Sequence, residues 1–140
     1  MNVQISYDEL ANYVQVRYMI RPQLKRVDDK TIQVSFRVGC LIDPIVLKIH
    51  IEAMRKDVVC LSYECSPAIA MLIAGVIGHC DKMLPEGVEL NADDKRVNIF
   101  LSYVEGVQKA IEYVELKDIH MKEEGLELVA NLCGNNSNKL

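Results

Sequence analysis

The stretch that most constrains the fold is residues 66–80, which hold no charged side chain. It begins with Ser66 and Pro67, a combination that favours the start of a helix. A helix that is apolar on every side has to be covered by protein, by a ligand or by a partner chain. We therefore predict that this helix lies at the centre of the fold, with Ile73 near the middle of the core.

Alternating apolar and polar residues predict strands on both sides of that helix. In residues 45–53, apolar residues alternate with Lys48, His50 and Glu52, which are assigned to the solvent face. This period of two is typical of antiparallel strands with one polar face. The same pattern, together with turn residues such as Gly125, predicts strands at residues 31–38, 45–53, 58–65, 88–90, 97–103, 113–121 and 126–132.

Two shorter helices complete the predicted α+β fold. Ser6 and Glu9 have the spacing of a capping box, which predicts a helix at residues 6–17. A second short helix is expected at residues 104–112. The fold class is thus a curved antiparallel sheet of about six to seven strands packed around the central apolar helix. The length favours a single domain at residues 1–133, followed by a disordered tail at residues 134–140.

Composition excludes several classes of function. The chain has 140 residues, a net charge of −4 and no Trp, which argues against a nucleic-acid binder. The apolar stretch is too short to cross a bilayer, and no secretory signal is visible at the start. The five cysteines are odd in number and lack C-x-x-C spacing, which argues against disulfides and zinc. We expect a cytoplasmic protein with free thiols and no cofactor, metal or transmembrane segment.

No catalytic group can be assigned from the sequence. His79 and Cys80 are adjacent, but neighbouring helix residues point about 100° apart, so His79 cannot readily serve as a base for the thiol. No H-x-x-x-H pair and no glycine-rich phosphate loop occurs in the chain. We therefore expect a non-enzymatic protein, without catalytic residues or metal ligands.

The apolar helix has one face of large residues and one of small residues. On the second face we place candidate ligand-binding residues, namely Ala70, Met71, Ala74, Gly75 and Gly78. Glycine inside a helix costs roughly 1 kcal/mol against Ala, so a close approach is a reason to have it. The approaching group is another element of the same chain, a partner helix of a homodimer or an apolar ligand.

A local basic cluster supplies the remaining candidates. Arg17, Arg21 and Lys25 have offsets that place them on one face of a strand or a helix. Such residues form either an ordinary solvated face or a grip on an anionic headgroup at the mouth of an apolar cavity.

The C-terminal third has a recognisable order of elements. A strand leads into a short helix and then into a strand written Val114-Glu115-Leu116-Lys117-Asp118-Ile119, followed by the closing Glu123-Glu124-Gly125-Leu126-Glu127-Leu128. This ending resembles small bacterial lipid-binding proteins of the tubular lipid-binding type, including the LmeA-like phospholipid-binding family. The resemblance implies an apolar cavity between a curved sheet and its helix, and no catalysis.

Two functions are consistent with these patterns. The first is a non-enzymatic protein that binds an apolar or amphipathic, lipid-like molecule between sheet and helix. The alternative is a protein–protein interaction module that forms a homodimer through the Gly/Ala helix stripe or through a sheet edge.

Overall fold

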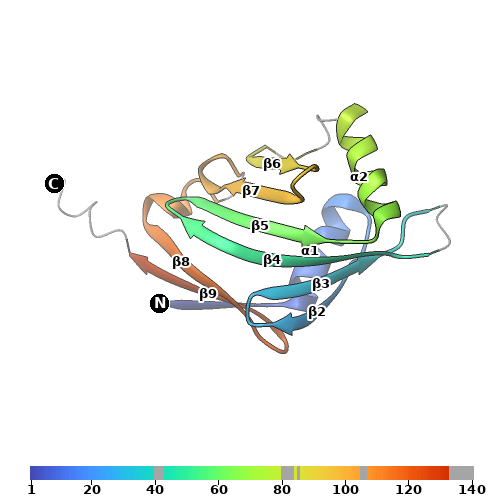
Figure 1. Cartoon of the computed structure of the whole chain (residues 1–140). Coiled ribbons are helices and arrows are strands. Elements are labelled where there is room, and N and C mark those ends of the chain that lie inside the picture. Colours follow the sequence, from blue (N-terminus) through green and yellow to red (C-terminus); the bar gives the residue numbers. More distant parts are fainter. Residues whose placement is uncertain (40–42, 80–83, 85, 105–106, 133–140) are drawn as a thin grey trace.

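The chain forms two antiparallel sheets and two α-helices (Figure 1). The computed structural model describes residues 1–39, 43–79, 84, 86–104 and 107–132, with the side chains of residues 76–79 left out. One sheet has six strands in the order β2-β3-β4-β5-β7-β6, and the other has the order β1-β9-β8. The elements are β1 Asn2–Ser6, α1 Tyr7–Tyr18, β2 Gln23–Asp28, β3 Thr31–Phe36, β4 Ile45–Arg55, β5 Val58–Glu64, α2 Pro67–His79, β6 Val88–Asn91, β7 Arg96–Phe100, β8 Val114–Met121 and β9 Gly125–Leu132.

The α+β class and the dominance of antiparallel sheet are confirmed. The predicted strands β3, β4 and β5 pair in sequence order as an antiparallel meander, with Val34 opposite Leu47 and Ile49 opposite Tyr63. The capping box at the start of α1 is present, since Ser6 Oγ accepts from the Glu9 N–H and the Glu9 carboxylate accepts from the Ser6 N–H. The alternation along β8 is interrupted by a register shift between Leu116 and Asp118.

The sequence analysis missed two strands and misassigned one helix. β1 and β2 lie at the edges of their sheets. β1 alternates polar and apolar residues but is only five residues long, and in β2 the apolar Leu24 and Val27 do not fall on one face. Instead of a helix at residues 104–112, the described residues form 3-10 turns at Leu101–Tyr103 and Ala110–Glu112. The strands also form two separate sheets, of six and three strands, and not the predicted single sheet of six to seven strands. The tail at residues 134–140 lies outside the described residues.

The prediction of one central helix is not confirmed. Figure 1 shows α2 at one end of the six-stranded sheet. Ile73 is only half-buried, so its assignment to the middle of the core is wrong. Met71 and Leu72 are 76% and 42% exposed. An all-apolar sequence shows what a helix can bury, but it does not show that anything in the same chain covers it.

The core lies where the two sheets meet. Ile32 of β3, Ile51 of β4 and Met121 of β8 form a buried cluster, with exposures of 7%, 6% and 4%. Leu126 of β9 and Tyr7 of α1 pack against this cluster. Helix α1 is therefore held beside the junction of the sheets, and this position creates the groove described next.

Candidate functional site

An apolar groove of about 510 Å³ lies between α1 and the sheets. Helix α1 contributes Leu10, Val14 and Tyr18, which are spaced four residues apart and therefore lie on one side of the helix. The volume is within the range of about 300–1,000 Å³ that is usual for small-molecule sites. The residues that line the groove are Leu10, Val14, Tyr18, Ile20, Pro22, Leu24, Ile32, Val34, Phe36, Met121 and Leu126.

The floor of the groove follows from the pattern of β3. Ile32, Val34 and Phe36 alternate with polar residues, so all three side chains project from the same face of the strand. Leu24 of β2 is paired with Val34 and adds to this face. Tyr18 is 53% exposed, so the groove opens to solvent beside the end of α1.

A second, smaller groove of about 260 Å³ lies between the sheet and α2. Leu47 and Ile49 of β4 and Ile73 of α2 are among the residues that line it. Val34 is the direct partner of Leu47 across β3 and β4. Because paired residues project from the same face of a sheet, the two grooves share one apolar sheet face.

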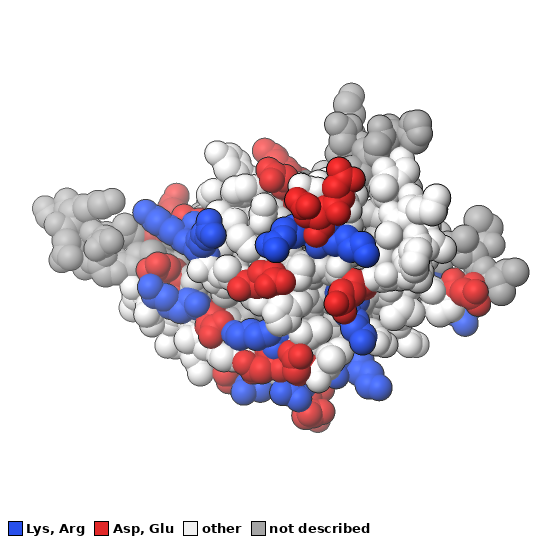
Figure 2. All heavy atoms as spheres, in the orientation of Figure 1, with Lys and Arg blue, Asp and Glu red and all other residues white. Residues whose placement is uncertain are grey.

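Of the predicted stripe of α2, Ala70, Met71, Ala74 and Gly75 line neither groove. Ala74 and Gly75 are exposed, and a Cβ added at Gly75 would have no neighbour within 4 Å. Ala70 is half-buried, and Met71 points largely into solvent. The area over this helix carries no charged side chain in Figure 2. The surroundings of Gly78 lie outside the part of the chain that the structure describes. The binding role of the stripe stays a prediction.

The three basic candidates do not share one face. The Arg17 guanidinium lies 5.0 Å from the centre of the Tyr13 ring. Arg21 follows α1 and is held against it by an ion pair with Asp8 at 3.1 Å and a hydrogen bond to Asn12. Lys25 neighbours the groove residue Leu24 in β2, so it projects from the opposite face of that strand. None of the three basic residues lines the apolar groove.

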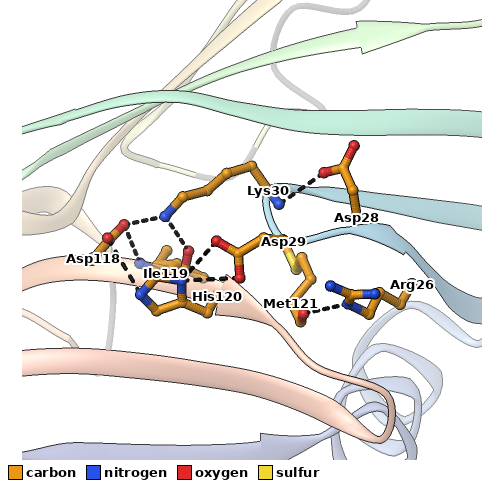
Figure 3. Close-up of polar contacts among 8 residues, drawn as sticks. All are labelled: Arg26, Asp28, Asp29, Lys30, Asp118, Ile119, His120 and Met121. Carbon is orange, nitrogen blue, oxygen red and sulfur yellow. Dashed lines mark hydrogen bonds and ion pairs between the residues drawn. The ribbon is translucent and has the colours of Figure 1, made fainter.

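A polar cluster that the sequence analysis missed joins the two sheets (Figure 3). On β8, His120 Nδ1 lies 2.9 Å from Asp29 Oδ2, and His120 Nε2 lies 3.4 Å from Asp118 Oδ2. Lys30 Nζ bonds to Asp118 and to the Ile119 carbonyl oxygen, the latter at 2.8 Å. Asp29 and Asp118 are more than 80 residues apart in the sequence. No local sequence motif could therefore have predicted this cluster.

The electrostatics of this cluster indicate a structural role. The hydrogen bond from His120 is the main cause that lowers the pKa of Asp29, and the bond from Lys30 is the main cause that lowers the pKa of Asp118. The two ring nitrogens of His120 contact the carboxylates of Asp29 and Asp118, which fix the ring between the β2–β3 turn and β8. The described residues also contain no group of three or more His, Cys, Asp or Glu side chains that could hold a metal ion. We interpret the cluster as a clasp that holds the β2–β3 turn on β8.

Two further results bear on function. Among the described residues, neither α-helix has both the length and the apolar character needed to cross a membrane. Comparisons with protein-family models, with curated proteins and with solved structures find no match.

Proposed function

We propose that this chain is a non-enzymatic binding protein that holds an apolar or amphipathic, lipid-like molecule in the groove beside α1. The observation that carries the proposal is the lining of this groove, where the Tyr18 hydroxyl is the one polar side-chain group among eleven residues. Burial of apolar surface contributes about 25 cal/mol per Å². A hydrocarbon chain would therefore bind here without leaving polar groups of the protein unpaired.

The packing around the groove supports the same proposal. Among the described residues, no large side chain is fully buried. A protein of this size ordinarily packs its interior as densely as an organic crystal. The groove is continuous with the core, because Ile32 and Met121 belong to both. A bound hydrocarbon would extend the core under α1 and complete its packing.

The proposal assigns the ligand to a different helix from the one that the sequence favoured. The larger opening is beside α1, whereas α2 covers the smaller one. Arg17, Arg21 and Lys25 are not part of the lining, so the proposal commits to the apolar part of the ligand and to no headgroup contact.

Native mass spectrometry of the purified protein tests the proposal. We expect a co-purified species whose mass corresponds to a fatty acid or a lipid. After delipidation, the protein should take up a fluorescent fatty-acid analogue that unlabelled fatty acid displaces. Delipidated, folded protein that does not take up the fluorescent analogue would exclude this function.

A further inference from the structure

One of the sheet edges lacks the features that keep edge strands apart. Natural proteins protect edges with charged residues, bulges or short strands. β2 carries Lys25 and Arg26, β6 has four residues and includes Glu89, and β8 has a register shift beside Lys117. β1, by contrast, is uncharged from Asn2 to Ser6 and pairs with β9 without a register shift. Among the described strands, β1 is therefore the edge that is open to pairing.

The outward backbone groups of β1 can be assigned from its hydrogen bonds. The Ala130 N–H donates to the Met1 carbonyl at 2.8 Å, and the Tyr7 N–H donates to the Glu124 carbonyl at 2.9 Å. Bonded and non-bonded positions alternate along an antiparallel pair. The odd-numbered residues thus bond to β9, whereas Asn2 and Gln4 direct their N–H and C=O groups to the open edge.

This arrangement is complementary to itself. If two copies of β1 pair in antiparallel fashion about a two-fold axis through Val3, Asn2 of one copy faces Gln4 of the other. Each such pair exchanges two backbone hydrogen bonds, and the two Val3 side chains meet between them. Val3 is 46% exposed in the single chain, so this contact would bury apolar surface. No charged side chain of β1 opposes the pairing.

We propose that β1 is a dimerisation edge, which pairs with β1 of a second copy to join two three-stranded sheets into one of six strands. A second copy presents the same uncharged edge, and its Asn2 and Gln4 offer the N–H and C=O groups that this register requires. This proposal does not depend on the ligand in the groove.

Sedimentation velocity at high protein concentration tests the edge. Wild-type protein should be a dimer, and Gln4→Pro should be a monomer. This substitution removes an N–H that points to the open edge, and proline is tolerated at such positions. Gln4→Ala retains the N–H and should remain a dimer. Far-UV circular dichroism should be the same for all three proteins.

A second set of variants keeps the test decisive if proline disturbs β1. Val3→Lys places two ammonium groups opposite each other at the axis and should also give a monomer. Val3→Cys should form a disulfide-linked dimer under mild oxidation, in excess of any linkage by the native thiols, whereas Gln4→Cys should not. A wild-type monomer, or a Val3→Lys protein that remains a dimer, would overturn the proposal.

Discussion

The carbonyl oxygen of Ile5 occupies the space that a side chain at position 125 would need. A Cβ at Gly125 would overlap this oxygen and would lie 2.7 Å from the Ser6 Cα. Gly125 is the partner of Ser6 in the β1–β9 pair and is almost fully buried. Its backbone is not in the positive-φ region that commonly explains a glycine in a turn. The reason for a glycine here is the close approach of β1.

We predict that Gly125→Ala destabilises the protein by about 2–3 kcal/mol, because overpacking against backbone cannot be relieved by a side-chain rotation. Gly75→Ala is the matched control. It lies in α2 with open space around it, so it should raise the free energy of unfolding by up to about 1 kcal/mol. Urea unfolding followed by circular dichroism measures both. Equal effects would contradict the close approach of β1 to Gly125.

The second prediction concerns two isoleucines with different surroundings. Ile51 is 6% exposed and belongs to the core cluster, whereas Ile73 is half-buried beside an open groove. Ile51→Ala should cost about 2–5 kcal/mol, the usual range for a core isoleucine. Ile73→Ala should cost about 1 kcal/mol, since part of its surface is already in solvent beside an open groove. Urea unfolding measures the free energy of unfolding of both variants. If Ile73→Ala lowered it more than Ile51→Ala, α2 would be part of the central core after all.

The third prediction is a loss of stability in acid. The pKa of Asp118 is lowered in the folded protein, mainly by the hydrogen bond from Lys30. A group with a lowered folded pKa stabilises the protein above its unfolded pKa, and this contribution disappears as the pH falls through the folded value. The loss of stability therefore falls in the pH range below 3.8, which is the ordinary pKa of an aspartate.

Asp118→Asn separates this contribution from general acid unfolding. At neutral pH the urea midpoint of this variant should be lower than that of the wild type, and the difference should shrink as the pH falls below the ordinary aspartate pKa. Asp93→Asn, in the exposed β6–β7 turn, controls for the loss of one charge. A wild-type advantage over Asp118→Asn that stays constant across this pH window would contradict the clasp.

Local pattern predicted the parts of the fold in which one face of an element is buried. Ile45 and Ile51 of β4 are buried as the alternation indicated. β2 was missed because it is an edge strand in which Leu24 and Val27 are the apolar residues. His50, which was assigned to solvent, is half-buried and lies 2.7 Å from the Thr31 hydroxyl. That contact depends on the register of β3 with β4, which alternation alone does not define.

The groove depends even more strongly on tertiary structure. Val14 and Val34 line it from two elements that a local pattern treats separately. The sequence favoured α2 because its residues are the more apolar, but the position of α1 is set by its contacts with β2 and β9. Spacing alone also grouped Arg17 with Arg21, whereas Arg21 is engaged by Asp8. Which helix covers which part of a sheet is decided by such long-range contacts.

The most direct test of the groove is a pair of tryptophan variants in α1. Val14 lines the groove, whereas Val16, two residues later, is 82% exposed. Val14→Trp should fill the space that the ligand needs, and Val16→Trp adds the same side chain on the outside of the helix.

The measurement is the dissociation constant of a fluorescent fatty-acid analogue for the delipidated proteins. We predict that Val14→Trp weakens binding by at least about tenfold, or 1.4 kcal/mol, while Val16→Trp binds like the wild type. Far-UV circular dichroism and urea unfolding would establish that both variants are folded. A folded Val14→Trp protein that binds the analogue as tightly as the wild type would contradict the assignment of the ligand to this groove.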